Sequence, residues 1–316
     1  MVFEREGKKK SMRANMSEIE HQENKESLHS RSYLFLNLVV PAALFILTLC
    51  TAIVSGVLVA GHEYLTLTSV WKGIPYALGV LIILGSHALG HYIEARLCKV
   101  KVYAPYFIPA LGFVGTIGAY TKIQWPISDR KTLIKIFATG PICGFFTAWI
   151  VLIVGLFFSN IVDIASLGSS VKMGDSIIMR LTTLAILGNL PSTKDVMLHP
   201  VAYAGWLGLF YNFCHLLPIG RFDGGRLTYA LWGYRVTLWI SFISIGALLI
   251  LGYFSSDWTI WLGIAIVGAI STIGLRGQYP DERYDQPLPI SMFVVLSIVV
   301  AIFIVSFTPI PLPIIK

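Results

Sequence analysis

Residues 73–97 read GIPYALGVLIILGSHALGHYIEARL, and this stretch decides the fold. It is long enough to cross about 30 Å of hydrocarbon as an α-helix, for which roughly 20 residues suffice. It is unusual for a membrane span because it carries His87, His91 and Glu94. Ionisable residues inside a span are costly and usually have a function. The stretch therefore predicts a membrane helix that carries chemistry.

The rest of the chain is as apolar as this helix. It has 316 residues, of which 55% are hydrophobic and 13% charged, and a mean hydropathy of +0.72, which excludes an ordinary soluble domain. With 73–97, the pattern predicts an all-α polytopic membrane protein of about seven transmembrane helices. The six other predicted spans contain no Asp, Glu, Lys or Arg: Leu34–Gly61, Ile136–Val162, Pro200–Gly220, Val236–Ser256, Trp258–Leu275 and Gln286–Ile315.

The distribution of charge predicts orientation. Lys and Arg cluster before the first span and after the second, fourth and sixth. The amino terminus and the end of 73–97 that carries the two histidines, where an active site would lie, are therefore expected in the cytoplasm. The net charge of +7 is explained by these loops, and nucleic acid is not expected as a partner. The four cysteines show no pairing pattern, so neither a disulfide framework nor a cysteine metal site is expected.

His87 and His91 are four residues apart, so on a helix both imidazoles point the same way. This spacing suits one zinc ion, although a chance pair or two core histidines would also give it. A third ligand must come from elsewhere, and Asp223 is the leading candidate. Pro218 ends the fourth span, and the glycines around Asp223 let the chain turn back toward the bundle. The alternative is a loop aspartate paired with an arginine.

The segment 104–122, APYFIPALGFVGTIGAYTK, is apolar but rich in proline and glycine, which disfavour a helix. Irregular backbone at membrane depth is tolerated only where protein buries it or where it lines a cavity. We expect a short re-entrant, β-like segment beside the site that His87, His91 and Asp223 would form, with an interfacial loop as the alternative.

Four motifs, in order, resemble the site-2 protease family of intramembrane zinc metalloproteases, in the type without a PDZ insertion. HALGH at 87–91 differs by one letter from the HExxH signature, and LLPIGRFDGG at 216–225 resembles the family's aspartate motif. Between them lie GTIGA at 115–119 and ATGPICG at 138–144. The resemblance implies that His87, His91 and Asp223 bind Zn²⁺ and that 112–122 pairs with an unwound substrate as an added strand. The substrate-binding residues so implied are Gly112, Gly115, Thr116, Gly118, Asn212 and His215.

Two positions depart from the family. Ala88 stands where the family has the glutamate that acts as general acid and base, and a methyl group cannot replace it. His215 stands where the family usually has an asparagine that hydrogen-bonds substrate. Its imidazole can donate such a bond or approach the metal itself, and Asn212 can share the role. Ala88 is either an engineered substitution or the mark of a natural pseudoprotease that binds membrane helices without cleaving them.

The resemblance implies a metalloendopeptidase that cleaves transmembrane or membrane-anchored protein substrates within the lipid bilayer, inactivated in this chain at position 88. A metal-ion transporter is the rival class, but no second copy of either metal motif supports paired repeats. The expected organisation is a charged, disordered cytoplasmic tail (1–32), the first helix and its loop (33–71), a protease-like core (72–235) and three C-terminal transmembrane helices (236–316).

Overall fold

The fold is described from a computed structural model of the chain, which is mostly helical. The predicted tail, 1–32, lies outside the described residues. The described residues are 35–62, 64–112, 114–125, 127, 129–166, 174–254, 258–273, 275 and 287–309.

Each of the seven predicted spans contains a helix, but not all of these helices are long. Four helical segments are long and apolar enough to cross a membrane by length and composition: Asn37–Val59, which joins the π-helical turn η1 (Phe35–Val39) to α2 (Val40–Val59), and α3 (Leu67–Leu97), α4 (Arg130–Phe157) and α7 (Asp223–Phe254). The other three, with 16 or 17 residues, are α6 (Pro200–Leu216), α8 (Trp258–Ile273) and α9 (Ile290–Ser306). A membrane protein is confirmed, whereas a count of seven spans stays a prediction.

Local sequence sets where the central helices begin. The Thr66 side chain accepts the Ser69 backbone N–H and Ser69 bonds back to the Thr66 N–H, which forms a capping box at the start of α3. Asp129 caps α4 in a similar way by accepting the Thr132 N–H. These caps satisfy backbone donors that the first turn leaves unpaired.

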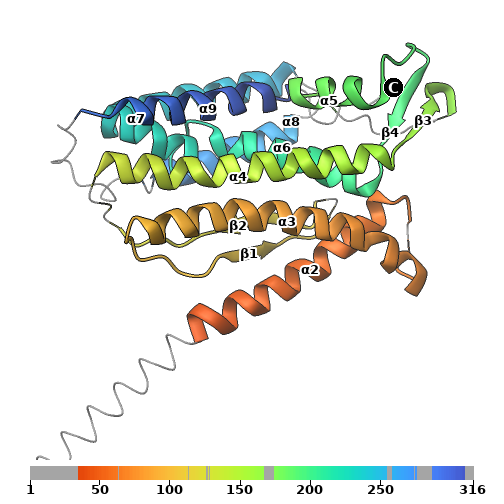
Figure 1. Cartoon of the computed structure of the whole chain (residues 1–316), viewed down its shortest axis with the longest axis horizontal. Coiled ribbons are helices and arrows are strands. Elements are labelled where there is room, and N and C mark those ends of the chain that lie inside the picture. Colours follow the sequence, from red (N-terminus) through yellow and green to blue (C-terminus); the bar gives the residue numbers. More distant parts are fainter. Residues whose placement is uncertain are drawn as a thin grey trace, which may run out of the picture.

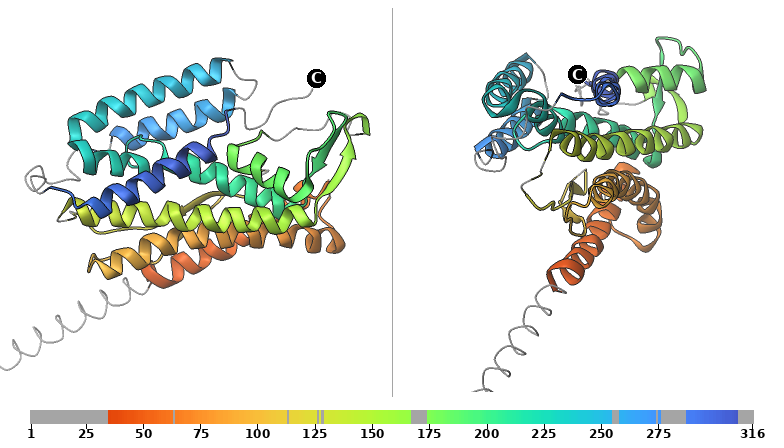
Figure 2. Two further views of the ribbon diagram at one scale, coloured as in Figure 1. Left: turned by 45° about the horizontal axis from the view of Figure 1, so that its top comes forward. Right: turned by 60° about the vertical axis from the view of Figure 1, so that its left-hand side comes forward.

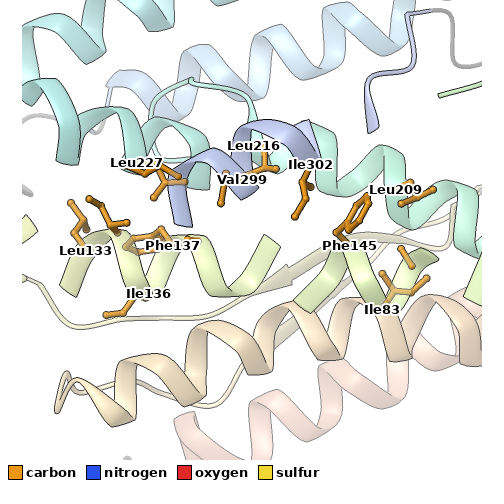
Figure 3. Packing of buried hydrophobic residues seen from close by; sticks show 14 of the residues in the cluster. Ile83, Leu133, Ile136, Phe137, Phe145, Leu209, Leu216, Leu227, Val299 and Ile302 are labelled. Carbon is orange, nitrogen blue, oxygen red and sulfur yellow. The ribbon is translucent and has the colours of Figure 1, made fainter. Parts of the chain in front are cut away.

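Helix α4 lies at the centre of the bundle (Figure 1). It packs against α3 on one side and against α6, α7 and α9 on the other. Figure 3 shows Phe137 and Phe145 of α4 facing side chains of these last three helices, among them Leu227 and Val299. This apolar packing fixes α3 relative to α7, which matters because each carries part of the site.

The segment predicted as re-entrant forms a β-hairpin. β1 (Tyr106–Pro109) pairs antiparallel with β2 (Thr116–Tyr120), and a register shift after Ile108 marks a bulge. β1 packs on α2 and β2 lies beside α3, so the hairpin sits along the bundle within reach of both helices (Figure 1). The β-like part of the fold prediction is confirmed.

Two features were not predicted. The segment between α4 and α6 contains a second hairpin, β3 (Asn160–Asp163) with β4 (Lys194–Met197), and the short helix α5 (Ile177–Leu187). Helix α7 begins at Asp223 itself and is broken at Gly233, whose φ is 76°. Beyond this break α7 runs beside α8 as a helical pair (Figure 2).

Candidate metal centre

Three side-chain donors from two helices converge inside the bundle. His87 Nε2 lies 3.2 Å from His91 Nε2 and 3.2 Å from Asp223 Oδ2. The three atoms form a triangle, and its third edge, from His91 Nε2 to Asp223 Oδ2, is 3.4 Å. All three residues are buried. The structure thus brings together the histidine pair and the aspartate that the sequence singled out.

The triangle has the dimensions of one face of a tetrahedral zinc site. Donor atoms at about 2.0–2.1 Å from a zinc ion are separated by about 3.3–3.4 Å when the geometry is tetrahedral. The measured edges of 3.2, 3.2 and 3.4 Å match this value. Two imidazoles and a carboxylate are also a ligand set that catalytic zinc uses. These residues therefore fit a zinc ion.

The ring orientation of His91 is set by the backbone of α4. Its Nδ1 lies 2.8 Å from the Ile136 carbonyl oxygen. A carbonyl can only accept, so Nδ1 carries the proton, and Nε2 of the neutral ring keeps a lone pair directed at the other donors. A backbone carbonyl on the second ring nitrogen is a common support of metal-binding histidines.

Helix α4 approaches α3 closely where it faces the site. A Cβ at Gly140 would lie 2.3 Å from His91 Nε2, and one at Gly144 would lie 2.9 Å from His87 Nδ1. Both glycines belong to the ATGPICG motif. The two imidazoles occupy the space that a side chain at each of these glycines would fill. Any larger residue at position 140 would therefore displace His91 Nε2.

His215 and Asn212 surround the same site from α6. His215 Nδ1 lies 3.1 Å from Asp223 Oδ2, and one donor atom each from His87, His215 and Asp223 lies within 4.8 Å of the others. The position of His215 therefore suits the metal as well as a substrate. Asn212 is 1% exposed, and neither of its amide atoms has a partner among the described residues. A Cβ at Gly144 would lie 3.2 Å from Asn212 Oδ1, which places this amide near His87.

Ala88 is fully buried on α3. Its carbonyl oxygen accepts a hydrogen bond of 3.4 Å from the Thr121 hydroxyl, which follows β2 directly. Helix α3 is therefore tied to the hairpin at the position where the family's glutamate is expected. No carboxylate is available from residue 88.

The other predicted substrate-binding residues lie at different places along the hairpin. Gly112 and Gly115 stand in its turn, and their carbonyl oxygens accept hydrogen bonds from Ser55 and Thr51 of α2. Thr116 is buried, donates to the Ile108 carbonyl and accepts the Gly118 N–H. Gly118 lies against the ring of Tyr211 on α6. These assignments stay predictions.

Sequence reasoning missed Tyr211 on α6. Its hydroxyl oxygen accepts the backbone N–H of Ala119 in β2 at 3.3 Å. Its ring centroid lies 4.3 Å from that of His215 and 6.0 Å from that of His87. Tyr211 precedes His215 by four residues, so both side chains leave the same face of α6. This four-residue spacing from His215 is the feature of the sequence that could have identified Tyr211.

A membrane bundle that buries two histidines and an aspartate at tetrahedral spacing is the arrangement expected of a membrane-embedded metalloprotein. The comparison with protein families gives the particular class: residues 75–251 match Peptidase family M50. The chain belongs to this family, the site-2 protease family that its motifs resemble.

Two relatives have names that agree with this assignment, and a third has a name that describes another domain. The chain is 28% identical over 216 residues to "Probable zinc metalloprotease EGY2, chloroplastic" of Arabidopsis thaliana, covering 67% of this chain and 39% of that protein. It is 34% identical over 196 residues to "Probable zinc metalloprotease EGY1, chloroplastic" of the same plant, covering 60% and 36%. The "DDT domain-containing protein PTM" of Arabidopsis thaliana is 30% identical over 223 residues, covering 68% and 11%.

The matched region thus spans about two fifths or less of each of these relatives. No solved structure matches the chain.

Proposed function

We propose that this chain is a zinc-dependent intramembrane metalloprotease whose zinc is held by His87, His91 and Asp223. The observation that carries the proposal is the buried triangle of donor atoms, with edges of 3.2–3.4 Å. When bound, zinc lowers the pKa of a water molecule to about 7 and polarises a carbonyl group, which is the chemistry that peptide hydrolysis needs. The names of the relatives support zinc as the metal.

The substrate is an extended segment of a membrane protein. A helix hides its peptide bonds in its own hydrogen bonds, so the segment must unwind before hydrolysis. The hairpin β1–β2 supports this proposal, because the described chain pairs no further strand with β2 and the Ala119 N–H points to Tyr211 of α6. Strand addition recognises backbone, which suits substrates of varied sequence.

Ala88 makes this chain defective in proton transfer. The residue that follows the first histidine should take a proton from the attacking water and deliver it to the leaving amine. The methyl group of Ala88 does neither, and loss of a general base costs about 10²–10⁴-fold in rate. The chain in its present form binds membrane segments and cleaves them poorly or not at all. An engineered protease and a natural pseudoprotease share this property.

The proposal places the metal-binding end at the cytoplasmic face. The segment that follows the His91 end of α3 carries Lys99, Lys101 and Lys122, and the first turn of α4 carries Lys131. Excess lysine and arginine in short loops marks the cytoplasmic side.

Reversion at position 88 tests the function. Ala88→Glu, purified in detergent with zinc, should cleave a membrane-spanning model substrate at least about 100-fold faster than the parent chain. Ala88→Gln is the matched control, since it adds similar volume without a proton acceptor of carboxylate strength, and it should stay inactive. A zinc-loaded Ala88→Glu variant that remained inert toward varied membrane substrates would contradict a protease and favour a binding protein.

A further inference from the structure

The edge of β2 that faces away from β1 is already in contact with a side chain, that of Tyr211. The Ala119 backbone N–H points away from β1 and donates to the Tyr211 hydroxyl oxygen at 3.3 Å. In strand addition this N–H would donate to a backbone carbonyl oxygen of the incoming strand. The phenol oxygen therefore stands where a substrate carbonyl oxygen would stand.

The fit of Tyr211 on the strand depends on Gly118. A Cβ at this position would lie 2.1 Å from Tyr211 Oη and 2.7 Å from its Cζ and Cε2. Gly118 also has a φ of +134°, a backbone conformation that residues with a side chain rarely adopt. The strand is thus shaped to receive the tip of the tyrosine ring.

The other side of the same ring faces the metal donors. Tyr211 lies against His215, which is itself 3.1 Å from Asp223 Oδ2. No described residue accepts the phenolic proton of Tyr211, so a single hydrogen bond, that with Ala119, holds the hydroxyl in place. One neutral hydrogen bond contributes about 0.5–1.5 kcal/mol, which an incoming backbone can replace.

We propose that Tyr211 is a displaceable occupant of a substrate subsite, in which the Ala119 N–H binds a backbone carbonyl of an extended peptide. This inference rests on the proposed function, because it takes strand addition next to the metal as given. The peptide carbonyl takes the Ala119 N–H, and Tyr211 swings off Gly118. Docking then replaces the hydrogen bond between Ala119 and Tyr211 with one between Ala119 and the peptide. A segment that pairs weakly with β2 therefore does not displace Tyr211.

The test uses the full-length, zinc-loaded chain in detergent and two metal-binding probes. Acetohydroxamic acid binds the metal alone, whereas acetyl-Ala-Ala-Leu-Leu hydroxamate adds an extended backbone of up to about 13 Å. Tyr211→Phe keeps the ring and removes the oxygen, so the Ala119 N–H is left unpaired until a peptide docks. Its Kd for the peptidyl hydroxamate should fall about five- to tenfold, because docking now gains a hydrogen bond.

Controls separate this effect from folding and from the metal. Tyr203→Phe, the same change on the same helix, should leave both dissociation constants unchanged. Zinc content and the Kd for acetohydroxamic acid should be equal in all three proteins, which shows that Tyr211→Phe is folded.

The outcomes distinguish the subsite from the function. If the peptidyl probe binds more tightly than acetohydroxamic acid but equally well to the parent and Tyr211→Phe, the role of Tyr211 is overturned while strand addition stands. The same holds if Tyr211→Phe binds the peptide more weakly. If the peptide backbone adds no affinity in any variant, strand addition fails and the subsite fails with it.

Discussion

His87 Nε2 lies 3.2 Å from Asp223 Oδ2, although 136 positions separate the two residues in the sequence. Helix α3 supplies the histidine and the first residue of α7 supplies the carboxylate. The contact depends on α4, which packs between the two helices and leaves space for the imidazoles at Gly140 and Gly144. The geometry of the candidate metal centre therefore depends on three helices rather than on one motif.

The close approach of α4 gives the first prediction. Gly140→Ala would place a methyl carbon 2.3 Å from His91 Nε2, so the imidazole must leave its position among the donors. We expect zinc affinity to fall about 10–100-fold or more, measured by competition with a chelator of known affinity. Gly246→Ala is the matched control, because an added Cβ there meets no atom within 4 Å. Equal zinc affinity in both variants would show that His91 is not a ligand.

Asn212 gives the second prediction. Its amide is buried without a partner among the described residues and lies near His87 Nδ1, for which the described part of the chain also offers no partner. An amide oxygen accepting from Nδ1–H would fix the His87 tautomer once Nε2 binds metal. Asn212→Leu should therefore weaken zinc binding about tenfold while the protein stays folded. If zinc affinity is unchanged but affinity for peptidyl hydroxamate falls, Asn212 contacts substrate instead.

The third prediction concerns stability at the break in α7. Arg130 donates from Nε to the Ala230 carbonyl at 2.6 Å and from Nη2 to the Leu231 carbonyl at 2.7 Å. These carbonyls end the helical segment before Gly233, so a cation there also complements the helix dipole. Arg130→Ala should lower the free energy of unfolding by about 2–3 kcal/mol, seen as a lower melting temperature in detergent. Lys131→Ala, at an exposed position of the same turn, should change it little.

His215 gives the fourth prediction. Since His87, His91 and Asp223 already offer three donor atoms at the spacing of a zinc site, His215→Asn should keep about one zinc per chain and lower its affinity by no more than about tenfold. Metal analysis by mass spectrometry after dialysis checks this. Loss of the metal would instead make His215 a required ligand, which its 3.1 Å contact with Asp223 also permits.

Much of this site could be predicted from the sequence because its signals are local. The spacing of His87 and His91 follows from helix geometry, and proline and glycine in 104–122 indicated the hairpin that β1 and β2 form. The position of Asp223 followed from the turn after Pro218, although the start of α7 at that residue did not.

The remaining features depend on tertiary packing. Gly140 is required because an imidazole from another helix occupies its side-chain space, and Tyr211 matters because β2 passes its hydroxyl. The spacing of Tyr211 and His215 puts both side chains on one face of α6, but neither this spacing nor the sequence of α4 shows which strand or imidazole lies opposite. The hairpin β3–β4 and helix α5 were missed for a related reason: their short segments lack the length and periodicity on which the span prediction relied.

The most direct test of the account is the zinc content of the purified chain and of Asp223→Ala. The chain should contain about one zinc ion per molecule, because three buried donors form one face of a tetrahedral site. Asp223→Ala should lose most of the metal under the same dialysis, while Asp195→Ala, on β4, should retain it. Full zinc occupancy in Asp223→Ala, or none in the parent chain, would contradict the assignment of the metal centre.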